Sequence, residues 1–146
     1  MYISAAEDIG LANPNAMLLV NACHQAVQMV GWPESRILLS ETAIYLACSP
    51  KSNSAYLAID KTLNLVRNSK TLAVPLHLRN AVTKLMGDLN YGKEYAYAHA
   101  FENQFIDQEY LPESISGTAF YNPSENPNED KNRSFLSERW KNKYNY

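Results

Sequence analysis

The sequence predicts an all-α protein: a compact helical domain of about five helices with one aromatic-rich irregular segment. Through most of the first 90 positions, apolar residues recur at steps of three and four, the spacing that lines one face of a helix. Proline stands at the ends of these periodic segments and never inside them. The joints between the earlier segments are two to five residues long, which is typical of helical hairpins.

The first long helix is expected between Asn13-Pro14 and Gly31, after a short helical segment from Tyr2 to Ile9. Asn can accept a hydrogen bond from an unpaired N–H at a helix start, and Pro at the first helical position has no N–H to lose. The apolar face comprises Ala16, Val20, Cys23, Val27 and Val30. Leu18, Leu19, Ala22 and Ala26 widen it, so this helix is expected to be buried on more than one side.

The second helix should run from Pro33-Glu34 to about Ser49, where Pro50 prevents continuation. Its apolar residues cover much of the cylinder, so we expect a core helix. These residues are Ile37, Leu38, Ile44, Tyr45, Ala47 and Cys48.

The third helix is expected over about Ser52 to Asn68, with Ser52 or Asn53 as its cap. Its predicted buried stripe is Tyr56, Ile59, Leu63 and Val66. Its predicted solvent side carries Asp60, Lys61, Asn64 and Arg67.

A shorter fourth helix is predicted from about Leu78 to Leu89, with Asn80 as a possible cap. Asn90 and Gly92 are the expected left-handed terminators, because Gly carries no Cβ that would clash there. Its apolar stripe is Leu78, Val82, Leu85 and Leu89.

Helical periodicity is lost from Lys93 to Glu125, although eight of the sixteen aromatic residues fall between positions 91 and 121. Disordered segments are poor in aromatics, so we expect this arm to be ordered and anchored to the helices by its rings. Short strand pairing is expected around Phe105 to Tyr110 and Ala119 to Tyr121.

The last helix should begin at Asn126-Pro127 and end near Asn142. Asn126 is a good cap, and Glu129 occupies the reciprocal position of a capping box. Its apolar stripe is narrow, which leaves two alternatives: the helix docks on its own domain or on another subunit. The chain is therefore read as one domain over residues 1–146, with a helical part at 1–92, an irregular arm at 93–125, and a C-terminal helix and tail at 126–146.

Composition excludes several classes. No apolar run approaches the roughly 20 residues that cross a bilayer, and residues 1–10 lack the basic start and apolar centre of a signal peptide, so a cytoplasmic location without membrane contact is expected. A net charge of −2 argues against a domain devoted to nucleic acid. Cys23 and Cys48 fall inside helical patterns and are expected to be free, buried thiols.

No catalytic, cofactor-binding or metal-binding residue is predicted. The three histidines, His24, His77 and His99, do not have the close spacing of a metal cluster. The segment Gly87 to Glu94 holds two glycines and a lysine, but it puts Glu94 where a phosphate-binding loop needs a magnesium-binding hydroxyl. We therefore expect this chain not to be an enzyme by itself.

Two sets of residues are candidates for contacts. Lys51 lies in a predicted turn between helices, where it could contact a phosphate or a neighbouring subunit. His77, Arg79, Lys84 and Lys93 could form a local basic patch that binds nucleic acid or a partner. The candidate contacts are Lys51, His77, Arg79, Lys84 and Lys93. The alternative is pairing within the chain, with Asp88, Glu94 or Glu102 as partners. Trp32 and Trp140 are candidate interface aromatics, or else pack within their own subunit.

Four segments carry a resemblance: AEDIGLANPNA at 6–16, ACSPKSNSAYLAI at 47–59, VPLHLRNAVTKLMGDLNYGKEYAY at 74–97 and QEYLPESISG at 108–117. From about Ala6 to Pro123 the chain resembles the C-terminal part of the RarA/MgsA family. These are bacterial relatives of the Werner-helicase-interacting ATPase, AAA+ ATPases associated with stalled replication forks and recombination.

The resemblance implies a piece of a larger machine: a collar domain, as in clamp loaders, that is associated with homotetramer formation. ATP and magnesium would belong to an ATPase module absent from this chain. The partner would be the chain itself, and DNA contact is possible through the full-length protein. Two alternatives stay open: a DNA-contacting module of the same ATPase, or a docking platform for another replication protein.

Overall fold

The computed structural model describes all 146 residues, and it confirms the all-helical class, with no β-strand. Its α-helices are α1 (Tyr2–Ser4), α2 (Asn15–Val30), α3 (Ser35–Cys48), α4 (Ser54–Asn68), α5 (Lys84–Asp88) and α6 (Pro127–Trp140). A π-helical turn (Ala5–Ile9) and a 3-10 turn (Gly10–Ala12) join α1 to α2. Further 3-10 turns span Leu76–Leu78, Ala98–Ala100, Glu102–Gln104 and Glu113–Ile115.

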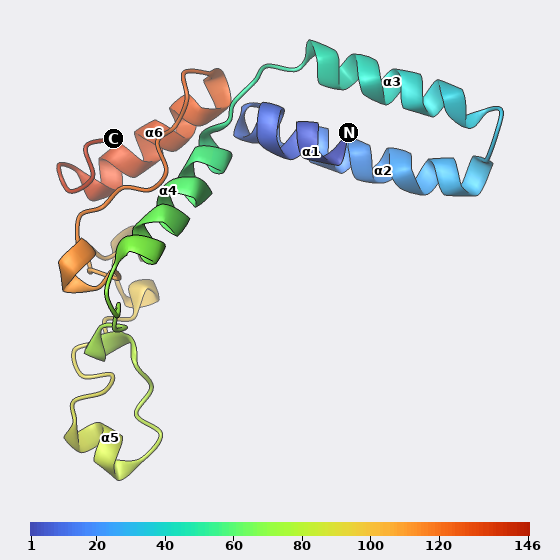
Figure 1. Ribbon diagram of the computed structural model, residues 1–146. Helices are drawn as coiled ribbons and strands as arrows, with labels where there is room; N and C mark the ends of the chain where they lie inside the picture. Colours follow the sequence, from blue (N-terminus) through green and yellow to red (C-terminus); the bar gives the residue numbers. More distant parts are fainter.

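The helices form two arms that meet at an angle (Figure 1). The first arm holds α1 and the antiparallel hairpin of α2 and α3. The second holds α4 and α6, which meet at their first turns, and continues into the irregular segment, with α5 at its far end. The short turns after α1 and the first residues of α4 and α6 meet where the arms join.

The core lies in the first arm. Ala5, Ile9, Ala16, Val20 and Leu46 are buried against one another, with Tyr45 packed on them. The predicted capping role of Asn13 is wrong, since its side chain makes no cap hydrogen bond. Its amide nitrogen instead donates to the Tyr45 hydroxyl (3.0 Å) and the Ser49 hydroxyl (3.1 Å), which ties the start of α2 to the end of α3.

The expectation that α2 and α3 are buried on several sides is wrong. Leu18 lies open to solvent, and Ile37 and Ile44 on α3 are 60% and 61% exposed. The reason is architectural: each helix of this arm has one long helical neighbour, so only one face of each is covered.

The stripe predicted to bury α4 is also uncovered. Tyr56, Ile59, Leu63 and Val66 are between 40% and 53% exposed. The better covered face of α4 is the adjacent one, formed by Ala58, Thr62, Leu65 and Ser69.

The loop before α4 is a turn, as expected. The Ser52 hydroxyl accepts from the N–H of Ser54, the first residue of α4, at 3.3 Å, whereas Asn53 makes no cap hydrogen bond.

The fourth predicted helix is shorter than its apolar stripe suggested. Leu78 lies in a 3-10 turn, and α5 starts only after Thr83, whose hydroxyl accepts from the Met86 N–H. Asn80 is therefore not the cap. Asn90 and Gly92 do adopt positive φ (63° and 71°), which confirms them as left-handed residues after the helix.

Strand pairing in the irregular segment is wrong, because no strand forms. A carboxylate orders part of the segment instead: Glu109 accepts from the N–H groups of Tyr110 and Leu111, both at 2.9 Å, and from the Ser116 hydroxyl. Ring anchoring is observed at Phe105, whose ring meets Trp140 edge to face at 5.0 Å.

Both cysteines are free, as predicted, but only Cys23 is buried; Cys48 is exposed on α3. No helix of the structure has both the length and the apolar character that crossing a membrane requires.

Candidate functional site

The junction between the arms is built around a buried carboxylate. Glu129, in the first turn of α6, is fully buried. The predicted cap is present, because the Asn126 side chain accepts from the Glu129 N–H (3.0 Å). The return contact of a capping box is altered: the Asn126 N–H donates to the Ser124 carbonyl (3.0 Å), and the Asn126 side-chain amide donates to Glu129 Oε2 (2.7 Å). Glu129 Oε1 accepts from the Ser54 hydroxyl (2.5 Å), the Tyr121 hydroxyl (2.9 Å) and the Ser124 N–H (3.2 Å).

These donors keep Glu129 ionised. Burial alone would raise its pKa, but the Ser52 and Ser54 hydroxyls, the Asn126 amide and the Ser124 N–H stabilise the charged form and lower the pKa to about 2. The carboxylate therefore links α4, α6 and the end of the irregular segment at neutral pH.

Two hydrogen bonds to backbone carbonyls hold the first arm to the same point. The Ser52 N–H donates to the Asp8 carbonyl (2.8 Å), and the Asn128 amide donates to the Ala12 carbonyl (2.7 Å). Gly10, at φ 49°, lies so close that a Cβ there would stand 2.6 Å from the Ser52 carbonyl oxygen. The junction therefore fixes how the two arms present their outer faces.

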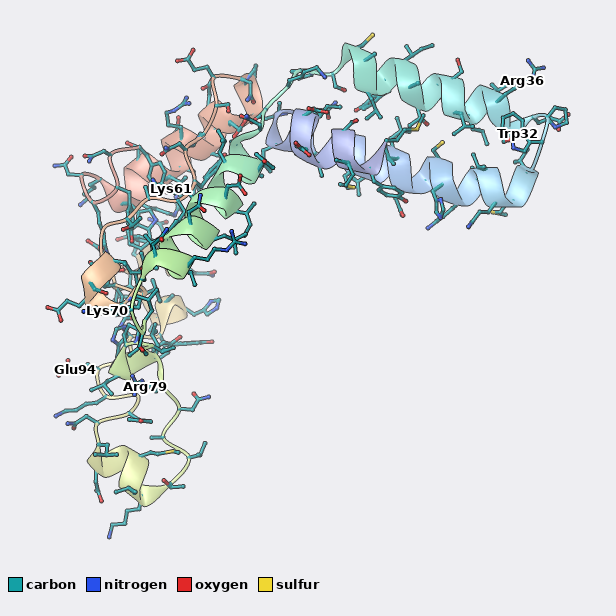
Figure 2. The ribbon with its side chains drawn as sticks, in the orientation of Figure 1. Trp32, Arg36, Lys61, Lys70, Arg79 and Glu94 are labelled. Carbon is teal, nitrogen blue, oxygen red and sulfur yellow. The ribbon has the colours of Figure 1, made fainter.

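Apolar side chains cover several of those outer faces. Besides the α4 stripe, they lie on α5 and its flanks (Val82, Leu85, Leu89) and at the tip of the α2–α3 hairpin (Met29, Val30, Trp32). Trp32 is 73% exposed and extends from the free end of the first arm (Figure 2). Trp140 is half-buried, and its ring makes edge-to-face contacts with the rings of Phe105 and Tyr144. Of the two interface candidates, Trp140 thus packs within its own chain.

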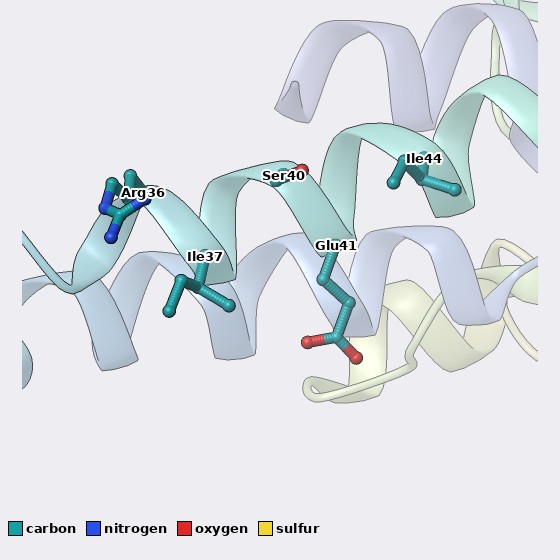
Figure 3. Close-up of a pocket in the computed structure, with 5 residues that line it drawn as sticks. All are labelled: Arg36, Ile37, Ser40, Glu41 and Ile44. Carbon is teal, nitrogen blue, oxygen red and sulfur yellow. The ribbon is translucent and has the colours of Figure 1, made fainter.

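A shallow hollow runs along the outer face of α3 (Figure 3). It has a volume of about 460 Å³ and is lined by Arg36, Ile37, Ser40, Glu41 and Ile44, all from this one helix. The sequence did not single out this surface, because the apolar pattern assigned Ile37 and Ile44 to the core. The helical period gives the direction of a side chain and not what covers it.

Three of the five basic candidates come together and two stand apart. Leu76 and Gly92 are hydrogen-bonded through their backbones at 2.9 Å, which brings Lys93 near His77 and Arg79. Lys84 lies at the start of α5, at the far end of the second arm, and Lys51 lies on the connector between the arms (Figure 1).

Two of these side chains serve the fold. The His77 ring contacts the Glu109 carbonyl at 2.8 Å. Arg79 donates to the Val74 carbonyl (2.7 Å) and the Tyr91 hydroxyl (3.2 Å), with its guanidinium 5.1 Å from the centre of the Tyr91 ring.

Lys51, Lys84 and Lys93 are exposed and form no ion pair, so the predicted alternative of pairing with Asp88, Glu94 or Glu102 is not observed. No group of three or more His, Cys, Asp and Glu residues is arranged to hold a metal ion.

Comparison with known proteins identifies the family. The model of the MgsA AAA+ ATPase C-terminal family matches residues 1–140, so the similarity continues past Pro123 and includes α6. The chain is 42% identical over 125 residues (86% of the chain) to replication-associated recombination protein A of Bacillus subtilis, and 41% identical over 120 residues (82%) to that of Coxiella burnetii. It is 44% identical over 122 residues (83%) to the ATPase WRNIP1 of Dictyostelium discoideum.

The chain spans less than a third of the length of these relatives: 30%, 27% and 14%, respectively. The match of the family model over nearly the whole chain, together with these identities, places the chain in one family. The chain belongs to the C-terminal domain family of the MgsA AAA+ ATPases, a family of replication-associated recombination ATPases.

Proposed function

We propose that this chain is the self-association domain of a replication- and recombination-associated AAA+ ATPase, and that it assembles as a homotetramer. The domain does no chemistry. It holds neighbouring ATPase modules, which would bind ATP and magnesium, in register at stalled replication forks. Each nucleotide site can then be completed by an arginine from the adjacent subunit, a geometry worth several powers of ten in rate.

The observation that supports the proposal is the accessible surface. One chain exposes 10306 Å², whereas a compact monomer of 16.5 kDa exposes about 7,600 Å². Much of the excess is apolar, because 25 large hydrophobic side chains are exposed. Exposed apolar surface of this extent is more than a typical monomer carries, and it supports a partner that covers part of it.

The charge of the chain supports a protein partner over nucleic acid. The net charge is −2, and the exposed faces of α3 and α4 combine isoleucine, leucine and valine with side chains of both signs. Binding to a phosphate backbone depends on a large excess of Lys and Arg, whereas α3 and α4 carry three cations (Arg36, Lys61, Arg67) against two anions (Glu41, Asp60).

The test is the solution mass of the fragment across a concentration series, by sedimentation equilibrium. We expect a species of four times the 16.5 kDa of one chain. A strict monomer at high micromolar concentration, together with a full-length protein that still assembles after this domain is deleted, would overturn the proposal.

A second candidate, DNA contact, is favoured by one observation. Lys84 and Lys93 are exposed without ion pairs, and Tyr95 and Tyr97 are exposed on the same arm. Cations beside free rings are the elements of single-strand binding, in which bases stack on aromatics.

The DNA candidate predicts salt-sensitive binding of single-stranded or forked DNA. The reversal Lys84→Glu with Lys93→Glu should weaken it at least tenfold in a gel-shift titration at low salt, whereas Lys131→Glu, on α6, should change it little. If the unmodified domain gave no shift at low salt, this candidate would be discarded.

A further inference from the structure

Apolar burial is confined to the first arm. Every buried apolar side chain lies between Ala5 and Leu46, in α2, α3 and the turns that precede α2. Among residues 49–146 the buried side chains are all polar: Ser49, Ser52, Ser54, Asn126 and Glu129. Ordering a residue costs conformational entropy, which apolar burial is the main means of offsetting. The second arm is therefore ordered with less apolar stabilisation for each residue than the first.

Polar contacts hold the second arm together instead. They centre on a set of hydrogen-bonded residues that joins the starts of α4 and α6 to the irregular segment. We call this set the Glu129 network: Ser52, Ser54, Tyr121, Ser124, Asn126 and Glu129. Farther along α4, the exposed Lys61 donates to the Ala119 carbonyl at 2.5 Å. A buried polar network stabilises only while its members keep their partners, so the loss of one member weakens the whole set.

The first arm does not depend on this network. Two hydrogen bonds join it to the second arm, from the Ser52 N–H to the Asp8 carbonyl and from the Asn128 amide to the Ala12 carbonyl. The apolar cluster of the first arm and the pairing of α2 with α3 involve no residue of the second arm. Small, polar contacts of this kind are those across which two parts of a chain move separately.

We infer that the two arms are separate units of stability, and that the Glu129 network is a latch for the second. When the network opens, residues 52–146 lose their order together while the α2–α3 hairpin stays folded. The second arm is thus a conditional part of the fold: a ligand that binds only its ordered form keeps the latch closed by mass action. The inference concerns the single chain and does not depend on self-association.

Hydrogen exchange of the full chain tests the latch, because it reports the opening of each segment separately. Glu129→Gln should accelerate amide exchange in α4 and α6 at least tenfold and leave exchange in the α2–α3 hairpin unchanged. The matched variant is Val20→Ala, at a buried position of the first arm. It should accelerate exchange in α2 and α3 at least tenfold, and α4 and α6 should respond less than twofold, since they open at lower cost on their own.

A milder variant grades the response. Tyr121→Phe removes one donor to Glu129, so it should accelerate exchange in α4 and α6 by a smaller factor than Glu129→Gln and again spare the hairpin. If Glu129→Gln accelerated exchange equally in both arms, or unfolded the hairpin as well, the chain would be one cooperative unit and the inference would be overturned. Unchanged exchange in α4 and α6 would overturn it too. Repeating the series at a tenfold lower chain concentration separates the latch from self-association, whose failure would leave the contrast between the variants in place.

Discussion

Glu129 is the residue on which the junction depends most. Four donors surround its carboxylate, and they come from positions as distant as Ser54, 75 residues earlier. The sequence predicted the local half of this arrangement, because a capping box involves only Asn126 and Glu129. The long-range half, with Ser54 and Tyr121, left no periodic or spacing signal.

Acid should destabilise the domain through Glu129. Its folded-state pKa of about 2 lies below the ordinary value of 4.5, so its contribution is complete above about pH 4.5 and is lost as the pH falls toward 2. Glu129→Gln should lower the free energy of unfolding at pH 7 by about 2–3 kcal/mol, because the Gln NH₂ group would face a donor in either orientation, the Asn126 amide or the Ser124 N–H. Urea melts from pH 7 to 2 measure both effects.

The matched control for that series is Glu138→Gln, an exposed carboxylate on the same helix. It should retain the unfolding free energy of the unmodified protein at pH 7. It should also retain the fall of that free energy as the pH drops below about 4.5. If the unfolding free energy of Glu129→Gln also fell with pH as it does in the unmodified protein, a group other than Glu129 would have to cause the acid sensitivity.

Gly10 should not tolerate a side chain. An alanine Cβ would lie 2.6 Å from the Ser52 carbonyl oxygen, at a φ of 49° that disfavours L-residues. We expect Gly10→Ala to cost about 1–3 kcal/mol of unfolding free energy in chemical denaturation. Gly87→Ala is the control, since α5 leaves open space there and alanine favours a helix by about 1 kcal/mol. Equal stability of the two variants would contradict the close approach.

At the scale of elements, the chain joins its irregular segment to α6 by aromatic rings. Trp140 lies between Phe105 (5.0 Å) and Tyr144 (5.1 Å), both edge to face. The sequence predicted ring anchoring from the aromatic content, and left open whether α6 docks on its own domain. Tertiary structure decided this, since Tyr121, Ser124 and the N-terminal Ala12 all bond to α6.

Trp140→Ala should loosen the irregular segment without unfolding the first arm. Each aromatic pair contributes about 0.5–1.5 kcal/mol beyond its buried area, so amide exchange near Phe105 should accelerate roughly tenfold or more. Exchange in the α2–α3 hairpin should not change. Phe135→Ala, an exposed ring on the same helix, is the control, and equal acceleration by both variants would argue against ring anchoring.

At the scale of the whole molecule, the proposed self-association predicts that stability depends on chain concentration. A chain that buries apolar faces against its own copies is stabilised by mass action. The thermal midpoint should therefore rise by a few degrees for each tenfold increase in chain concentration. Calorimetry over a hundredfold range measures this, and a midpoint that does not move would speak against assembly.

The sequence by itself determined the family and the all-helical class. It also determined where most helices begin and end, because caps, prolines and left-handed residues act within a few positions of one another. Asn126 and Gly92 were predicted for this reason. The limits of the fourth helix and the strands of the irregular segment were predicted wrongly. The stripe from Leu78 to Leu89 has helical spacing, but α5 covers only Lys84–Asp88, and no strand forms.

Only tertiary structure decided which apolar faces are covered. A 3.6-residue period shows that Ile44 and Leu63 share helical faces with other apolar residues, and it gives no information about whether a segment of the same chain lies against them. Covering a face requires a second element at the right distance and angle. In this protein the junction at Glu129 and Gly10 sets that angle, and it leaves the α4 stripe open.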